Sequence, residues 1–202
     1  MDKVHVIWAF QWILYCFVHS FLANNYIKGL FQRYLSMGIY MYRIFYNLIA
    51  LIYLLVLLWL HLGLNSPLLF HATPISRILA LVFMLPGAVI MSLCIAKYFK
   101  QLSGAFRANA PSQLYTGGLH QVVRHPLYFG TFLFLIGLSL YWPMLKNVLV
   151  IAIIIFYTLI GIIMEEKKLL NQFGEVYKAY QQKVPMIIPR FRIRNKKTFW
   201  GN

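Results

Sequence analysis

The sequence predicts an all-α integral membrane protein, a bundle of about five transmembrane helices followed by an amphipathic helix at the membrane interface. Composition is the first reason, because 61% of the 202 residues are apolar, 11% are charged and the mean hydropathy is +0.67. A soluble domain needs more polar surface than this. The second reason is a set of long apolar stretches, each near the ~20 residues that cross a hydrocarbon core of about 30 Å. None of them alternates with the period of two that is typical of a membrane strand.

The apolar stretches are interpreted as membrane-spanning helices of a single membrane domain, residues 1–202. They cover residues 4–23, 44–64, 75–96, 127–145 and 148–164. The first follows Lys3 as a signal peptide would, but its length and the lack of a small-residue cleavage site favour a retained helix. The third contains Pro86 and Gly87, and a proline that removes a backbone donor is expected to kink it.

Polar segments lie between and after these spans. Residues 97–126 form the longest polar connection, with glycine and proline breakers, and connections of this length usually carry function. Beyond residue 164 the chain becomes amphipathic, which predicts an interfacial helix that Pro185 and Pro189 stop. The chain therefore divides into three N-terminal helices (4–96), a loop with a helical hairpin and the amphipathic helix (97–189), and a basic tail (190–202).

The charge distribution predicts the orientation in the membrane. The net charge is +15, from 19 Lys and Arg against 4 Asp and Glu. Assigning the loops to alternate sides puts Lys3, Arg77 and Lys146 on one side and the other sixteen basic residues on the opposite side. The positive-inside rule then places the N-terminus outside and the C-terminus in the cytoplasm, as in a bacterial inner-membrane protein. Orientation and contact with anionic membrane lipids account for the basic charge without nucleic acid as a partner.

The hairpin of the last two spans brings charged residues together. Arg124, His125 and Pro126 precede its first helix, and Glu165 and Glu166 follow its second helix. Each also has a structural interpretation, with the arginine as a positive-inside anchor, the proline as a first helical residue, and the carboxylates as partners of nearby lysines. Their joint position on one membrane face favours a binding site, since ionisable groups at a membrane edge are costly and usually paired.

Residues 114–189 resemble the membrane methyltransferases that include isoprenylcysteine carboxyl methyltransferase and the phospholipid methyltransferases. The resemblance is carried by an ordered set of residues: Gly118, Arg124-His125-Pro126-Leu127-Tyr128-Phe129-Gly130, Glu165-Glu166, Leu169, Phe173-Gly174, Tyr177, Tyr180, Val184-Pro185 and Pro189. A second set in the N-terminal half resembles the bacterial branch that contains nitrite/nitric-oxide-reduction accessory proteins and methanethiol S-methyltransferases. Its members are Trp12, His19-Ser20, Ala23, Lys28 and residues 42–47.

The resemblance implies a methyltransferase that binds S-adenosylmethionine between the loop before the hairpin and the carboxylates after it. Carried over residue by residue, the cofactor contacts fall on Ser112, Gln113, Leu114, Tyr115, His120, His125, Pro126, Leu127, Tyr128 and Glu165. Arg124 and His125 are the expected catalytic residues. The expected acceptor is a small or lipophilic molecule, and the N-terminal resemblance favours a thiol. Gly161 stands where the isoprenylcysteine enzymes have an arginine that helps to bind their substrate, which argues against that acceptor.

The chemistry of these residue types fits methyl transfer. A sulfonium donor disperses its charge during in-line displacement, so the site must mainly hold the donor and align the acceptor. Glu165 can accept hydrogen bonds from ribose hydroxyls or an amino group, and Arg124 can pair with a carboxylate through two hydrogen bonds. His125 can hold the cofactor or take a proton from a thiol, while Tyr115 and Tyr128 offer aromatic faces to a cation. No His, Cys and carboxylate set on this side has ligand spacing, so no metal is implied.

The sequence is also compatible with other functions. A phospholipid or other amine methyltransferase is an enzymatic alternative, as is an isoprenylcysteine carboxyl methyltransferase. A non-enzymatic accessory protein could use the same scaffold after losing cofactor binding. His19, at the end of the first span, is interpreted as an interfacial histidine rather than a catalytic one.

Overall fold

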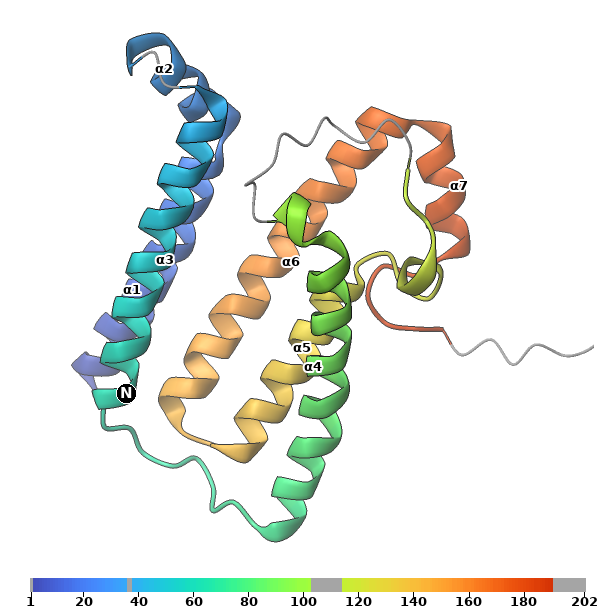
Figure 1. Cartoon of the computed structure of the whole chain (residues 1–202). Coiled ribbons are helices and arrows are strands. Elements are labelled where there is room, and N and C mark those ends of the chain that lie inside the picture. The colour runs from blue at the N-terminus through green and yellow to red at the C-terminus, as the bar shows by residue number, and fades with distance from the viewer. Residues whose placement is uncertain (1, 36–37, 103–113, 191–202) are drawn as a thin grey trace, which may run out of the picture.

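The computed structural model describes residues 2–35, 38–102 and 114–190, and its elements are helical (Figure 1). In chain order they are α1 (Lys3–Ala23), α2 (Asn25–Leu35), α3 (Ile39–Gly63), α4 (Pro74–Leu102), the short 3₁₀ helix η1 (Gly118–Gln121), α5 (Pro126–Tyr141), α6 (Leu145–Phe173) and α7 (Glu175–Lys183). Within the described ranges the one β-type contact is an isolated bridge between Leu68 and Met144. The all-α membrane bundle expected from the sequence is confirmed.

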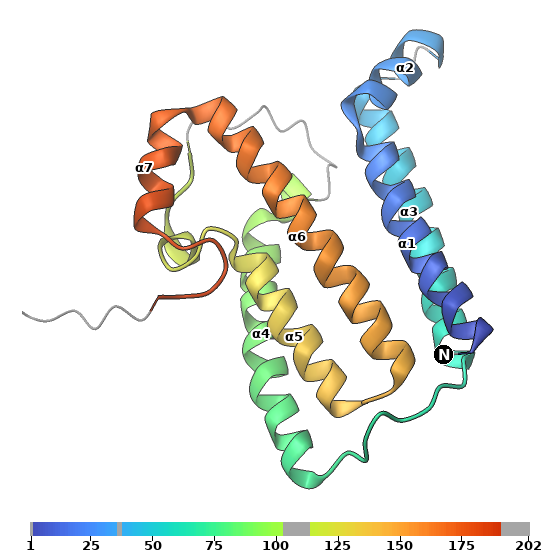
Figure 2. The same ribbon diagram turned by 180° about the vertical axis from the view of Figure 1, so that it is seen from behind.

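The long helices form two groups that lie side by side in both views (Figures 1 and 2). One is the pair α1 and α3, with α2 at one end, and the other is α4, α5 and α6. Helices α1, α3, α4 and α6 are long and apolar enough to cross a membrane, whereas α5, with 16 residues, is shorter. Many large apolar side chains on the long helices are exposed, as contact with lipid requires.

The joint between the two groups is an aromatic and aliphatic cluster. Trp8 and Trp12 of α1, Leu57 of α3 and Val150 of α6 are each at most 7% exposed and pack in one core. Since α1 and α6 run in the same direction, this core ties the N-terminal pair to the hairpin along the lower half of both helices (Figure 1).

Small residues set the contact between α4 and α5. A Cβ added to Gly87 would lie 2.6 Å from the backbone nitrogen of Phe134, and one added to Gly137 would lie 2.6 Å from the carbonyl oxygen of Ala80. Neither position has room for a side chain, so the two backbones approach closely, as is common between membrane helices. Pro86 lies inside α4, and the helix continues on both sides of it.

Two of the differences from the sequence prediction affect the end of the bundle that holds α2 and α7. The segment between the first two spans, expected as a loop, contains the helix α2, whose apolar and polar residues are separated on two faces. The last span does not end at residue 164, because α6 continues unbroken to Phe173 and carries Glu165, Glu166 and two lysines in its final turns. Gly174 ends it with a φ of 53°, a left-handed conformation that glycine adopts without strain, and α7 turns back from there.

Candidate active site at the end of the hairpin

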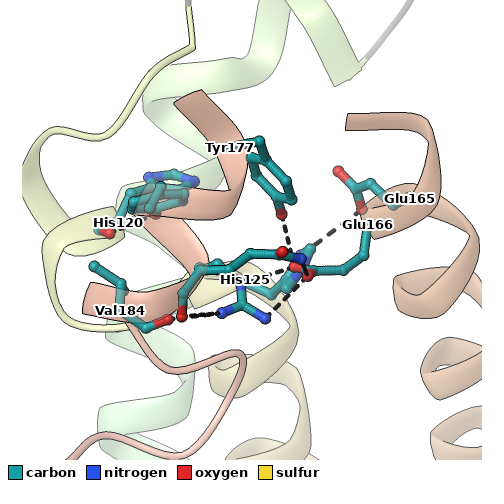
Figure 3. A network of polar contacts seen from close by, with 9 residues as sticks. His120, His125, Glu165, Glu166, Tyr177 and Val184 are labelled. Carbon is teal, nitrogen blue, oxygen red and sulfur yellow. Dashed lines mark hydrogen bonds and ion pairs between the residues drawn. The ribbon is translucent and has the colours of Figure 1, made fainter. Parts of the chain in front are cut away.

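The site is assembled at the end of the bundle that also holds α2 and α7 (Figure 1). His125 is the N-cap of α5, and Pro126 follows as its first residue, where a missing N–H costs nothing. The last turns of α6 bring Glu165 and Glu166 alongside, and α7 folds back over them. Arg124 and His125 therefore meet the carboxylate pair, as the hairpin topology predicts, and Figure 3 shows these side chains together.

Glu166 is the centre of the polar network, and its carboxylate accepts five hydrogen bonds. Arg124 donates two of them, from Nε to Oε1 and from Nη2 to Oε2, both at 2.9 Å. His125 Nε2 lies 2.7 Å from Oε1, the hydroxyl of Tyr177 donates at 2.7 Å, and Gln181 Nε2 donates to Oε2 at 2.6 Å. A carboxylate has about four lone-pair sites, so the acceptor capacity of Glu166 is used up inside the protein.

Arg124 also holds the last turn of α7 and the chain that follows it. Its Nη1 donates to the carbonyl oxygens of Gln181 at 3.1 Å and Val184 at 2.7 Å. The backbone N–H groups of Arg124 and His125 donate to the carbonyls of Pro185 and Met186. We call residues 181–186 the strap. The guanidinium is thus engaged on three of its nitrogens, and its side chain is only 10% exposed.

Glu165 differs from its neighbour in every respect that matters for binding. Its side chain is 46% exposed, against 11% for Glu166, and its closest basic contact is His125 Nδ1 at 3.8 Å. The Tyr128 hydroxyl also faces it. Because carboxylates only accept, the short contact with Glu166 requires a hydrogen on His125 Nε2. Glu165 therefore keeps acceptor capacity for a bound molecule.

Tyrosines of α7 cover the network from one side. Burial, together with the hydrogen bond to Glu166, raises the pKa of Tyr177 well above 10. Burial also raises the pKa of Tyr180 to about 12, and its hydroxyl donates to the carbonyl of His120 at 2.6 Å. Both phenols stay neutral donors at physiological pH. Leu114, Leu169, Leu170 and Phe173 pack around these rings, so α7 shields the buried carboxylate from water.

Comparison with known proteins adds the family. Residues 75–176 match the sequence model of the phospholipid methyltransferases. The chain belongs to this family. It is 30% identical over 187 residues to a methanethiol S-methyltransferase of a Pseudomonas species, covering 88% of this chain and 70% of that protein. It is 28% identical to methanethiol S-methyltransferase 1 of Bradyrhizobium diazoefficiens, covering 87% of this chain and 64% of the relative, which is less than two thirds.

A relative that matches a shorter part of the chain is named for a different acceptor. The protein-S-isoprenylcysteine O-methyltransferase of Schizosaccharomyces pombe is 31% identical over 86 residues, or 42% of this chain and 36% of that protein. No solved structure matches the chain significantly. The phospholipid methyltransferase match covers α4 to the start of α7, so it includes the whole hairpin and leaves α1 to α3 outside.

The residues expected at the cofactor site fall into three groups. His125, Tyr128 and Glu165 lie together, with the His125 and Tyr128 rings 5.8 Å apart, and the buried Pro126 and half-buried Leu127 form the first turn of α5 beside them. Leu114, Tyr115 and His120 form a second layer under α7. Ser112 and Gln113 lie outside the described residues.

The second layer is organised by a lysine that the sequence did not single out. Lys97, from the end of α4, lies 4.4 Å from the centroid of the Tyr115 ring and donates to its hydroxyl. The ring of His120 packs edge-on against Tyr115 at 5.5 Å. Burial lowers the pKa of His120, and the nearby His125 and Lys97 lower it further, so this imidazole is neutral at physiological pH. Gly118, with a φ of 60°, makes the turn that brings this layer under α7.

The sequence does not predict that Tyr177 and Gln181 bind the carboxylate of Glu166. Both are read in the sequence as part of an amphipathic helix, and their spacing of one helical turn places them on one face. That face meets Glu166, which the apolar periodicity of the segment does not reveal. A carboxylate that is paired with an arginine needs further hydrogen-bond donors only if it is buried. Whether Glu166 is buried can be seen only in the folded structure.

Proposed function

We propose that this protein transfers the methyl group of S-adenosylmethionine to a small thiol at the cytoplasmic end of the hairpin. The observation that carries the proposal is the contrast between two adjacent carboxylates. Glu166 is saturated by internal hydrogen bonds, whereas Glu165 is 46% exposed beside His125 and Tyr128. A half-exposed carboxylate on a rigid support is suited to a ligand that carries hydroxyl groups and positive charge.

The residues present fit this cofactor. Glu165 would accept from a ribose hydroxyl or an amino group, and the ring face of Tyr128 would lie against the positive charge. His125 holds its ring in place through its hydrogen bond to Glu166, so its Nδ1 edge faces the same space as Glu165. When bound, S-adenosylmethionine supplies an electrophilic methyl group on a sulfonium.

Arg124 has a positioning role in this proposal. Its guanidinium binds both Glu166 and the strap, and these bonds hold the side chains of His125 and Glu165 in a fixed relative position. The sequence led us to expect Arg124 as a catalytic residue. We propose instead that it acts through Glu166. Preorganisation of this kind contributes to catalysis because the donor and acceptor must meet within a few tenths of an ångström.

A small thiol is the acceptor that the observations favour. The relatives that cover most of the chain carry the name methanethiol S-methyltransferase. Gly161 offers no cation to an anionic acceptor group. In the reaction the thiol sulfur forms the new bond to the methyl carbon, and the bond from that carbon to the donor sulfur breaks with its electron pair left on the donor. The thiol proton goes to a base.

The orientation follows from the charges. The end with the site carries Lys97 and the basic residues of α6 and α7, and the opposite end carries Lys3, Arg77 and Lys146. The positive-inside rule then puts the site in the cytoplasm, where a water-soluble cofactor enters directly.

The test is methyl-label transfer with purified protein in lipid nanodiscs. Methyl-labelled S-adenosylmethionine is supplied with a short alkyl thiol, and the label is followed into volatile thioether, phospholipid and protein. We expect label in the thioether, and a loss of at least tenfold in Glu165→Gln. Label in phospholipid would assign an amine lipid as the acceptor instead, and absence of saturable cofactor binding by the folded protein would support the accessory-protein function.

A further inference from the structure

The imidazole of His125 has a carboxylate near each of its two nitrogens. Its Nε2 is 2.7 Å from Oε1 of Glu166, and its Nδ1 is 3.8 Å from Oε2 of Glu165 (Figure 3). The first distance is that of a short hydrogen bond, and the second is too long for one. One nitrogen of the ring is therefore bound within the protein, and the other is not bound to either acid.

Glu166 determines which nitrogen of His125 carries the hydrogen. Arg124 donates a hydrogen bond to each oxygen of Glu166, and a guanidinium in this position keeps the acid ionised. An ionised carboxylate only accepts hydrogen bonds, so Nε2 of His125 must be the donor in its contact with Glu166. In the neutral ring the other nitrogen then has a lone pair and no hydrogen. The structure thus presents Nδ1 as a proton acceptor.

This Nδ1 atom is also accessible. In the part of the chain that the structure describes, the Nδ1 atoms of His5, His19 and His61 are buried and have no hydrogen-bond partner. Nδ1 of His125 has no hydrogen-bond partner there either, but it is not enclosed in the same way. It borders Glu165, whose side chain is 46% exposed. A molecule that reaches Glu165 can therefore reach the lone pair on Nδ1.

The charges around His125 suit the transfer of a proton to it during thiol methylation. In that reaction one positive charge disappears from the sulfonium, and an imidazole that takes the thiol proton gains one. The new charge would lie 3.8 Å from the Glu165 carboxylate and 2.7 Å from the Glu166 carboxylate. Opposite charges at these distances attract strongly in a site that is largely buried. Glu165 would therefore face a cation before the transfer and another after it.

We propose that Nδ1 of His125 is the base that takes the thiol proton, and that Glu166 is the positioning residue that keeps this nitrogen free of hydrogen. The inference rests on the proposed thiol methylation and assigns the base which that reaction needs. The S–H bond breaks as its proton moves to Nδ1, and the sulfur forms the bond to the methyl carbon. Glu165 then stabilises the charged imidazole until the proton passes to water, which returns His125 to its starting state.

The first test compares two thiols in His125→Gln, which removes the basic nitrogen but keeps an N–H donor for Glu166. At saturating cofactor and neutral pH, methyl transfer to a short alkyl thiol should fall by about 10²-fold, a usual contribution of a general base. Transfer to a fluorinated aryl thiol, which is already a thiolate at this pH, should be close to that of wild type. Titration calorimetry gives the cofactor affinity, so that weaker binding is not mistaken for a lost base. His71→Gln, at an exposed histidine of the opposite end, is the control and should match wild type with both thiols.

A second test needs no turnover. Nitrogen-15 NMR of histidine-labelled protein in nanodiscs, at about pH 8.5 where histidine rings are neutral, reports which ring nitrogen carries the hydrogen. The signals of His125 are those missing from His125→Gln, and we expect a hydrogen on Nε2 and none on Nδ1.

The outcomes separate this inference from the proposed function. The opposite tautomer would overturn the role of Glu166, and equal losses of transfer to both thiols in His125→Gln would overturn the base. Both results leave thiol methylation intact. Wild-type protein that binds no cofactor, or that methylates no thiol, would instead overturn the proposed function and this assignment with it.

Discussion

The two ends of the bundle each bury a basic side chain, and they use it differently. Lys146 is 8% exposed, and its ammonium donates to the carbonyls of His61 and Leu64, each at 2.7 Å. Arg124 also donates to backbone carbonyls, but its fork holds Glu166 as well. The first arrangement joins α6 to the end of α3. The second joins the strap to the hairpin and fixes a carboxylate whose neighbour stays accessible, and that remaining acceptor capacity distinguishes a binding site from a structural joint.

The largest effect is expected where the fixed carboxylate loses its cation. Arg124→Ala leaves Glu166 buried without its main partner, and breaking a buried pair in this way costs about 3–5 kcal/mol. We expect a lower free energy of unfolding and no detectable cofactor binding, measured by thermal unfolding in detergent and by titration calorimetry.

Arg124→Lys is the matched variant for this prediction. It keeps the charge but not the planar fork, so it should recover part of the stability and little of the cofactor affinity. If Arg124→Ala unfolded at the same temperature as wild type, the ion pair of Arg124 with Glu166 would not stabilise this end of the bundle.

The next effect falls on binding alone. Glu165→Gln keeps the size of the side chain, and the group is too exposed to be needed for folding. Loss of a charge-assisted hydrogen bond costs about 1.5–3 kcal/mol, so we expect cofactor affinity to fall by about 10–100-fold with unchanged thermal unfolding. Glu175→Gln, an exposed acid on α7, is the control and should change neither quantity.

The difference in exposure between Glu165 and Glu166 separates what the sequence could predict from what it could not. The spans, the hairpin and the meeting of Arg124 and His125 with the two acids follow from apolar length and chain order. Which acid stays accessible does not, because adjacent helical residues point about 100° apart and the rotation of α6 is set by packing.

A smaller effect is expected at the opposite end. Lys146→Met removes the hydrogen bonds to the carbonyls of His61 and Leu64 while keeping an unbranched apolar stem. We expect the free energy of unfolding to fall by about 1–3 kcal/mol, since two carbonyls lose a charged donor. Cofactor affinity should stay within about twofold of wild type. If cofactor affinity also fell in Lys146→Met, the two ends of the bundle would be coupled, and the contacts of Lys146 would also support the site.

The smallest effect concerns Tyr177, one donor of five to Glu166. Tyr177→Phe should cost about 1 kcal/mol, because the other donors remain. Burial and the Glu166 carboxylate raise the pKa of this phenol above its ordinary 10, so its contribution to stability is complete below pH 10 and is lost as the pH rises further. Wild type should therefore lose more thermal stability than Tyr177→Phe as the pH rises above about 10.

Tyr180→Phe sharpens the same comparison, since the pKa of Tyr180 is raised to about 12 mainly by burial and its hydroxyl bonds a neutral carbonyl. Its removal should also reduce the alkaline loss of stability, but cofactor affinity should respond only to Tyr177→Phe, because only that hydroxyl bonds Glu166. Equal effects of both variants on affinity would mean that α7 acts on the site by covering it rather than through Glu166. The carboxylate network would then be a joint like that of Lys146, and Glu165 alone would carry the binding.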